Sequence, residues 1–281
     1  MVKRGLLAML ALSILCCLVA CGKKGADETA GTDATTDASA VSEVVPGEMV
    51  FIPAGEFIMG SNVKDKDDKY TNAYPEHKMN LPAYWIDKYE VTNLEFLQFS
   101  VDKDYAGEGA LQDKNWRLFH TVGMNDNVPV VYITWKDAET YCKANGKRLP
   151  TEPEWEKAAR GAEGLRYPWG NEWEDGRALT NEAGSTAVDI GRYDDVSPYG
   201  VHDMLGNVQE WTASIYGPYK GGKADSGADR QWRVVRGLSR NHRAKQGGLW
   251  NRDAREPSAL LDYGFRCAKD ATPEDIAKNT K

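Results

Sequence analysis

The tryptophan residues divide this chain into a part that can build a hydrophobic core and parts that cannot. All nine lie between residues 47 and 269, whereas residues 22–46 are rich in Ala, Thr, Asp and Gly and contain no aromatic side chain. A segment of that composition cannot bury enough apolar surface to offset its chain entropy, so we expect a flexible tether there. Residues 47–270 are long enough for one sizeable core and predict a single domain, followed by a polar tail over residues 271–281.

The first 21 residues have the pattern of a bacterial lipoprotein signal peptide. Lys3 and Arg4 precede an apolar run that is too short to span a membrane. The sequence Leu18-Val-Ala-Cys21 matches a lipobox, so we expect cleavage before Cys21 and acylation of that cysteine. Two or three acyl chains anchor a protein stably to a membrane. Gly22 agrees with sorting to the outer membrane, so the predicted location is the bacterial cell envelope. An ordinary secretory signal with a chance cysteine is the alternative.

The charge of the chain argues against one class of partner. It has 35 Lys and Arg against 42 Asp and Glu, a formal net charge of −7, and no basic run. Nucleic-acid-binding domains carry basic patches that neutralise phosphates. We therefore expect no nucleic-acid partner.

Cys142 and Cys267 are the only cysteines after the N-terminal segment. Two thiols in an oxidising compartment usually pair. A bridge across so long a loop stabilises a fold by about 4 to 5 kcal/mol in chain-entropy models. Two separate, buried, reduced cysteines are the alternative.

Three helix starts can be read from the sequence. Thr92 with Glu95 and Thr134 with Asp137 have the spacing of a capping box, and Thr151-Glu-Pro-Glu154 opens a third helix with its proline in the first turn. We expect Leu94, Leu97 and Val101 to form one face of the first helix. The acids Glu152, Glu154 and Glu156 are interpreted as capping and dipole features. After Gly161 the helical periodicity disappears, which indicates short strands in long connections and an α+β fold with much irregular structure.

Six motifs, taken in order, resemble the formylglycine-generating (sulfatase-modifying factor) family over nearly the whole domain. This resemblance implies a variant of the C-type-lectin-like fold, and a disulfide between Cys142 and Cys267. The motifs are Ile52-Pro-Ala-Gly-Glu-Phe-Ile-Met-Gly60, Glu90-Val-Thr-Asn93, Lys147-Arg-Leu-Pro-Thr-Glu-Pro-Glu-Trp-Glu156, Tyr167-Pro-Trp-Gly-Asn171, Gly206-Asn-Val-Gln-Glu-Trp211 and Gly264-Phe-Arg-Cys267.

The turn from Asp203 to Glu210 is the predicted metal site. Calcium prefers six to eight oxygen ligands, and a tight turn can supply carboxylates and carbonyls together. The resemblance implies a structural calcium held by the side chains of Asp203 and Glu210 and by the carbonyl oxygens of Gly206 and Val208. A plain acidic turn, in which Glu210 bonds backbone amides, is the alternative.

The family's copper-binding cysteine pair is missing from this chain. It follows a turn that matches Arg236-Gly-Leu-Ser239, and without gaps its two positions fall on His242 and Gly247. Copper(I) prefers soft thiolates, so we do not expect copper here. The remaining catalytic candidates are Ser239, His242 and Arg255. The family's second disulfide is missing too, since its positions fall on Ala159 and Arg252.

These observations favour an envelope-anchored binding or accessory protein that has lost the copper oxidase chemistry. Its groove would engage a protein or glycan ligand near Trp232, Arg236 and Trp250, because loop aromatics suit such ligands. The alternative is an oxidoreductase with an altered metal site, such as an iron site that includes His242, although the four histidines show no His-x3-His-x-Glu spacing. Formylglycine generation itself is the least favoured reading, because both thiol ligands are replaced.

Overall fold

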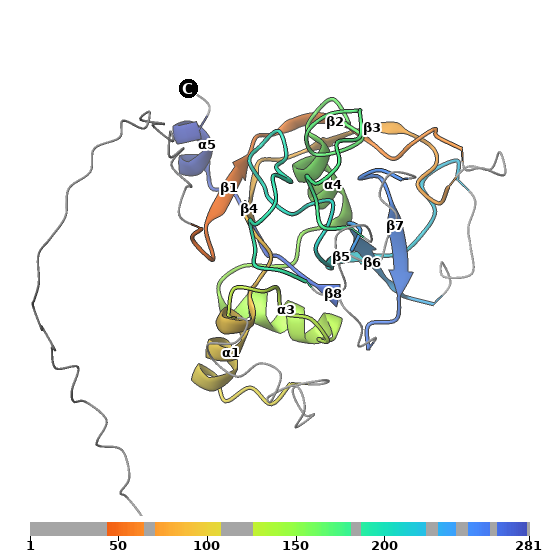
Figure 1. The fold of residues 1–281 in the computed structure, drawn as a ribbon. Coiled ribbons are helices and arrows are strands. Elements are labelled where there is room, and N and C mark those ends of the chain that lie inside the picture. The colour runs from red at the N-terminus through yellow and green to blue at the C-terminus, as the bar shows by residue number, and fades with distance from the viewer. Residues whose placement is uncertain are drawn as a thin grey trace, which may run out of the picture. The chain divides into compact units, whose positions relative to one another are not determined.

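Short strands in three small sheets, with helices packed against them, make up the described part of this computed structural model (Figure 1). The structure describes residues 44–64, 71–107, 126–180, 187–222, 230–239, 247–258 and 263–279. The predicted signal peptide with Cys21, most of the predicted tether, and His242 lie outside these residues. Within them, no helix is both long and apolar enough to cross a membrane.

Two of the sheets are formed mainly by the first strands of the domain. One has the order β1-β4-β9 and the other pairs β2 with β3, with antiparallel neighbours throughout. In β2 buried and more exposed side chains alternate, since Phe57 and Met59 are buried and Glu56 is exposed. The strands are β1 (Met49–Ile52), β2 (Gly55–Met59), β3 (His77–Leu81), β4 (Tyr84–Asp87) and β9 (Ala268–Asp270).

The third sheet organises the centre of the domain and has the order β7-β6-β5-β8. Successive side chains of a strand point to opposite faces. Along β5, Glu210 bonds Trp155 of helix α4, while the next residue, Trp211, packs in the cluster that contains helix α3. The sheet therefore has an α4 face and an α3 face. Its strands are β5 (Gln209–Ile215), β6 (Arg233–Arg236), β7 (Arg252–Arg255) and β8 (Tyr263–Gly264).

The three predicted helices are present with their expected starts. Thr92 and Thr134 each accept a hydrogen bond from the backbone of the residue three positions on, in a complete capping box, and Thr151 does the same with Glu154. The third helix ends at Gly161, as expected. The helices are α1 (Asn93–Asp102), α3 (Trp135–Ala144), α4 (Glu152–Arg160) and α5 (Pro273–Asn279).

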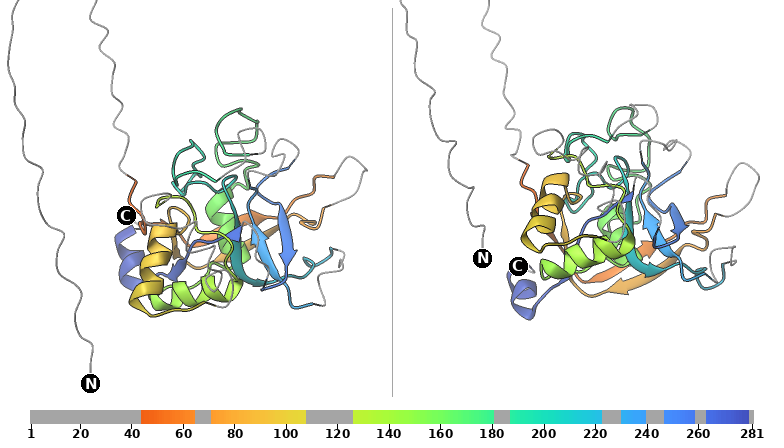
Figure 2. Two further views of the ribbon diagram at one scale, coloured as in Figure 1. Left: turned by 60° about the horizontal axis from the view of Figure 1, so that its bottom comes forward. Right: turned by 90° about the horizontal axis from the view of Figure 1, so that it is seen from below.

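The expected core face of α1 is wrong. Leu94 and Val101 are exposed, at 40% and 67%, and the buried aromatic positions are Phe96 and Phe99. Their rings pack against Tyr141 of α3 at centroid distances of 5.6 and 5.2 Å. Aromatic rings bury more apolar area than leucine or valine, so the helix turns that side to its neighbour. Figure 2 shows α1 and α3 side by side at one end of the domain.

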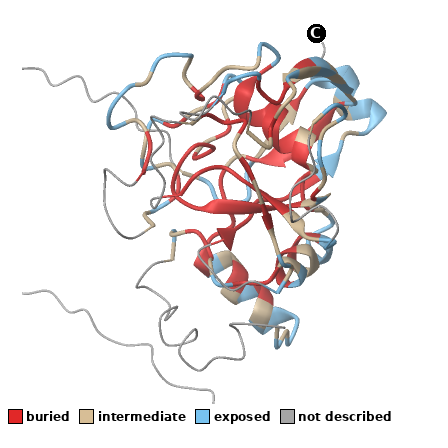
Figure 3. Ribbon diagram, turned by 90° about the vertical axis from the view of Figure 1, so that its right-hand side faces the viewer, coloured by how far each residue is buried: buried red, intermediate tan, exposed pale blue. Residues whose placement is uncertain are grey.

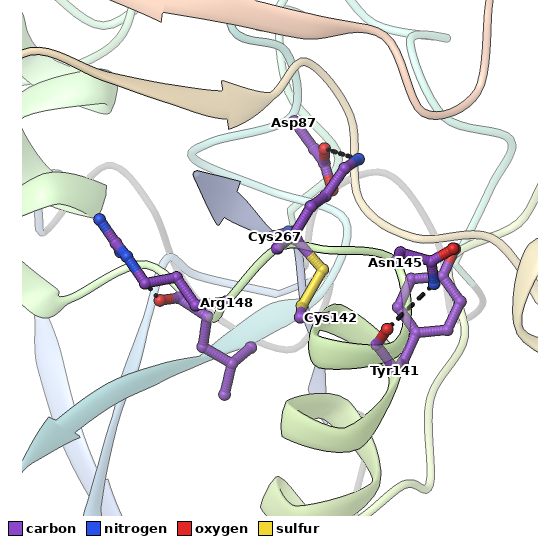
Figure 4. Close-up of a disulfide and its surroundings, with 8 residues drawn as sticks. Asp87, Tyr141, Cys142, Asn145, Arg148 and Cys267 are labelled. Carbon is purple, nitrogen blue, oxygen red and sulfur yellow. Dashed lines mark hydrogen bonds and ion pairs between the residues drawn. A yellow bond between two sulfur atoms is a disulfide. The ribbon is translucent and has the colours of Figure 1, made fainter. Parts of the chain in front are cut away.

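The predicted disulfide between Cys142 and Cys267 is confirmed. Both cysteines are fully buried, their Cα atoms are 5.6 Å apart, and the bond joins α3 to the segment before β9 (Figure 4). Beside it, Asp87 Oδ2 accepts from the backbone N–H of Cys267 at 2.8 Å, and Asp87 Oδ1 pairs with Lys147 at 2.6 Å.

Burial is concentrated where the central sheet meets α4 and α3. Figure 3 shows buried residues running through the central strands and α4, while the outer surfaces of α1 and α5 are exposed. The predicted α+β class is confirmed, with long irregular connections between the elements. These connections bring the acidic turn, α4 and β6 together.

Candidate functional site

The turn from Asp203 to Glu210 is held in shape by a carboxylate that the sequence analysis did not single out. Asp195 is fully buried, and its Oδ2 accepts from the backbone N–H groups of Leu205 at 2.9 Å and Gly206 at 3.0 Å. Asp203 has a φ of 59°, in the left-handed region. At Gly206 a Cβ would lie 2.5 Å from the carbonyl oxygen of Leu179, so the close packing requires glycine.

Glu210 forms a buried ion pair with Arg266. Arg266 donates from Nη2 to Oε1 and from Nε to Oε2, both at 2.8 Å, and Trp155 Nε1 donates to Oε2 at 2.9 Å. Glu210 thus meets a guanidinium and an indole, rather than the backbone amides of the plain acidic turn. The other Arg266 donors bond the carbonyl oxygens of Asp87, Lys88 and His202.

More carboxyl groups are buried around this turn than Arg266 alone can pair with. Burial raises the pKa of Asp195 to about 8 and that of Asp203 to about 6. Burial, reinforced by the negative charge of Asp203, raises the pKa of Glu90 well above its ordinary value. Both carboxylate oxygens of Glu90 and Oδ1 of Asp195 meet no hydrogen-bond partner among the described residues. Buried charges of this kind are normally paired or coordinate a cation.

These surroundings fit a cation beside Asp203, but they do not fit the ligand set that the sequence predicts. The Glu210 carboxylate is already taken by Arg266, whereas Glu90 forms no hydrogen bond to Arg266 and pairs with it only at 3.9 Å. In the described residues no group of three or more His, Cys, Asp or Glu side chains converges as a metal site. Backbone carbonyl oxygens would therefore have to complete the shell, as they commonly do for calcium.

A second buried network joins α4 to β6 and β7, on the α4 face of the sheet. Arg252 donates from Nε and Nη2 to the two carboxylate oxygens of Glu152, at 2.6 and 2.8 Å. Arg236 and Arg160 both pair with Glu156, at 2.6 and 2.5 Å. Glu152 lies in the first turn of α4, as the dipole interpretation expects, but that interpretation misses the main role of Glu152 and Glu156, whose buried side chains pair with three arginines. Glu154 does complete the helix cap.

Arg236 and Trp250, predicted to line a ligand groove, are interior residues. Arg236 is fully buried, and its Nη1 donates to the carbonyl oxygen of Trp250 at 3.0 Å. Trp250 is 6% exposed, and the guanidinium carbons of Arg160 and Arg166 lie 5.4 and 5.7 Å from the centroid of its ring. The prediction for these two residues is wrong, because ion pairing and cation–π stacking bring them into the core.

Trp232 is the predicted binding residue that stays at the surface. It is half-buried, packs against Tyr216, Val234 and Ala254, and has Arg230 over its ring at 5.1 Å. The three predicted binding residues thus do not come together in one groove.

The positions matching the missing thiols cannot both be placed, because His242 lies outside the described residues. At Gly247, a Cβ would lie 2.4 Å from Asn251 Nδ2, so the asparagine amide occupies the space where a side chain would begin. Ser239 is buried at the end of the turn after β6. Arg255 bonds the hydroxyl of Tyr263 and forms an ion pair with Asp253.

Comparisons with known proteins identify the family. The model of the sulfatase-modifying factor enzyme 1-like domain matches residues 35–271. The chain is 32% identical to the inactive C-alpha-formylglycine-generating enzyme 2 of Mus musculus, over 79% of this chain and 86% of that protein. It is 28% identical to the formylglycine-generating enzyme of Bos taurus, over 81% and 76% of the two chains. Among solved structures, PvdO from Pseudomonas aeruginosa shares the fold, with a TM-score of 0.63 and 23% identity over 79% and 94%. The chain belongs to the family of sulfatase-modifying factor enzyme 1-like domains.

Proposed function

We propose that this protein is a binding or accessory member of the family that lacks copper oxidase activity. The observation that supports this most directly is the state of its cysteines. Residues 47–270 contain two, Cys142 and Cys267, and both are buried in one disulfide. Neither can supply a thiolate to copper(I), which requires soft ligands for tight binding. One position of the family's thiol pair is Gly247, where the Asn251 amide fills the adjoining space.

The experiment that tests this proposal is a direct assay for aldehyde formation. The purified mature domain is incubated with copper(I), oxygen and a peptide containing Cys-x-Pro-x-Arg, and the peptide is analysed by mass spectrometry. We expect the cysteine to remain unmodified, under conditions in which a formylglycine-generating enzyme converts the same peptide. An aldehyde product would refute the proposal.

Metal analysis of the purified protein separates the proposal from the oxidoreductase alternative. A binding protein of this kind is expected to hold no stoichiometric copper or iron. Stoichiometric copper or iron that is lost in the variant His242→Ala would favour an enzyme with an altered metal site.

We also propose that calcium binds beside the acidic turn and has a structural role. Asp203 and Glu90 would contribute carboxylate oxygens, while Glu210 remains paired with Arg266. The support for this is the excess of buried carboxyl groups and the weak pairing of Glu90, which meets Arg266 only at 3.9 Å. Calcium would supply the positive charge that Arg266 alone does not.

The proposed location is the outer membrane of a bacterial envelope, through acylation of Cys21. It is supported by the sequence Leu18-Val-Ala-Cys21. Metabolic labelling with a palmitate analogue should modify the wild-type protein in a bacterial host and leave Cys21→Ala unlabelled. Equal labelling of both would contradict the proposal.

A further inference from the structure

Two arginines lie directly opposite each other on the α3 face of the central sheet. Arg233 of β6 and Arg255 of β7 are register partners in an antiparallel pair. The Cβ atoms of such partners are about 5 Å apart on the same face, and like charges at that position destabilise a sheet. This arrangement therefore calls for a negative charge to lie between or above the two guanidiniums.

The Arg233 guanidinium is fixed in place but has an unused donor. It lies over the ring of Trp135, with 3.8 Å between the guanidinium carbon and the ring centroid, and its Nη1 donates to the carbonyl oxygen of Ala213 at 2.8 Å. Its Nε is buried and meets no acceptor in the part of the chain that the structure describes. A buried donor without an acceptor is costly, so a ligand that accepts from it gains from the preformed geometry.

Arg255 is held on the other side and remains partly open. Its Nη1 donates to the carbonyl oxygen of Ala254 at 3.0 Å, and the Tyr263 hydroxyl accepts from its Nε. It pairs with Asp253, and the side chain is 33% exposed. Asp253, on the same strand as Arg255, therefore offsets part of the positive charge of the two arginines.

Among the described residues packed around the pair, the neighbouring acid on α3 is already paired with lysines. On β5, the register partner of Arg233 is Ile215, which is apolar. On α3, Glu139 acts electrostatically on Arg233, but it is already paired with Lys136 at 2.9 Å and with Lys143 at 2.8 Å. The local charge is therefore positive on a protein whose net charge is −7.

We propose that Arg233 and Arg255 form a binding site for a carboxylate group of a ligand. The planar guanidinium fork matches a carboxylate in a bidentate arrangement, and Trp135 and Tyr263 keep the two forks in place. This inference rests on the proposed function as a binding protein, and it names the chemical class of the ligand. The net negative charge of the protein disfavours general attraction of anions, so binding depends on this pair.

The test follows the arginine Nε–H resonances of the mature protein by NMR while glutarate is added. We expect the Arg233 Nε–H resonance to shift and to saturate at millimolar glutarate. Arg233→Gln and Arg255→Gln should each weaken binding by about tenfold or more, because each removes charge-assisted hydrogen bonds. Arg230→Gln is the matched control, since it removes the same charge from a residue that stacks on Trp232, and it should leave the affinity unchanged.

Further experiments identify the source of the carboxylate, and certain outcomes would refute the proposed site. A short peptide with a free C-terminal carboxylate is compared with the same peptide amidated, and a loss of binding on amidation assigns a peptide ligand. If glutarate binds and neither peptide does, the ligand is a small carboxylate. An unmoved Arg233 resonance, equal weakening by Arg230→Gln, or tighter binding of inorganic phosphate than of glutarate would refute the proposal. The wild-type titration needs no variant, so a folding defect cannot mask the result.

The two proposals can fail separately. An aldehyde product in the peptide oxidation assay would refute the accessory function, whatever glutarate does. A protein that forms no aldehyde and shows no Arg233 shift would keep its proposed function and lose only this site.

Discussion

Arg266 faces Glu210 in the centre of the domain, with two hydrogen bonds of 2.8 Å between the guanidinium and the carboxylate. Both side chains are fully buried, and Arg266 also bonds three backbone carbonyl oxygens. The pair therefore ties the acidic turn to the strand connections around β4 and β9. Glu210 is already neutralised by this pair, so we propose Glu90 in its place as a carboxylate ligand of calcium.

Loss of this pair should be strongly destabilising. Removing one partner of a buried ion pair leaves the other charge without compensation, at a cost of about 3 to 5 kcal/mol. We expect Glu210→Gln to lower the free energy of unfolding by that amount in a urea titration. The control is Glu56→Gln, which removes an exposed partner of Lys78 and should leave the transition midpoint unchanged. Equal behaviour of the two variants would show that the buried pair contributes little.

Calcium removal tests the role of Glu90. If calcium binds only the folded state, a hundredfold excess over its Kd adds about 2.7 kcal/mol, so chelation should lower the Tm by about 5 to 10 °C. We expect Glu90→Gln to abolish the difference between calcium and chelator, because it removes the proposed carboxylate ligand. Glu210→Gln should retain that difference. The reverse result would restore the ligand set that the sequence predicts.

The sequence predicts the helices better than it predicts their surroundings. Capping boxes are local, so the residue pair Thr134 and Asp137 alone defines a helix start, and the structure confirms it. The disulfide could be predicted because two cysteines leave one pairing. In contrast, the roles of Glu152 and Arg252 depend on contacts between residues 100 positions apart. Nothing in the local pattern distinguishes a capping acid from one that points into the core.

The role of Glu90 in the candidate site could not be predicted from the sequence, for the same reason. It stands in the motif Glu90-Val-Thr-Asn93, whose other residues account for the start of α1. Its carboxylate becomes informative only when the chain folds and places it beside Asp203. The sequence shows an acid next to a capping box, but it does not show that this acid is buried. The burial of a single glutamate cannot be read from periodicity.

Removal of the disulfide should lower the free energy of unfolding by several kcal/mol. Chain-entropy models give about 4 to 5 kcal/mol for a loop of this length. The variant Cys142→Ala/Cys267→Ala should therefore unfold at a lower urea concentration than the wild type. Reduction of the wild type should reproduce that shift, and reduction of the variant should have no effect. A further shift of the variant under reducing conditions would contradict the assignment.

Asp87 should make the stability depend on pH. Burial raises the pKa of Asp87 from 3.8 to about 6 against the opposing effect of Lys147. Because the folded state favours the protonated form, this contribution is present below pH 3.8 and is lost as the pH rises through 6. The loss is about 3 kcal/mol for a shift of this size. Asp87→Asn cannot titrate, so its stability should rise relative to that of the wild type between pH 4 and pH 6. Parallel stability curves for the two proteins would contradict the shift.

Arg252 joins β7 to α4, the two elements that a second disulfide of the family would connect at Ala159 and Arg252. The Arg252 guanidinium donates hydrogen bonds to both carboxylate oxygens of Glu152, and its carbon lies 4.2 Å from the centroid of the Tyr219 ring. Lysine keeps the charge but cannot make the bidentate contact or stack as a plane. We therefore expect Arg252→Lys to cost about 1.5 to 3 kcal/mol in urea unfolding.

The control for this substitution is Arg192→Lys, which makes the same chemical change at an exposed position. It should leave the unfolding midpoint unchanged, because surface substitutions away from buried contacts change stability little. If Arg252→Lys also left the unfolding midpoint unchanged, the positive charge alone would be enough to hold β7 to α4. A selective loss at Arg252 means that the planar geometry of the guanidinium, fixed between Glu152 and Tyr219, supplies the cross-connection between these two elements.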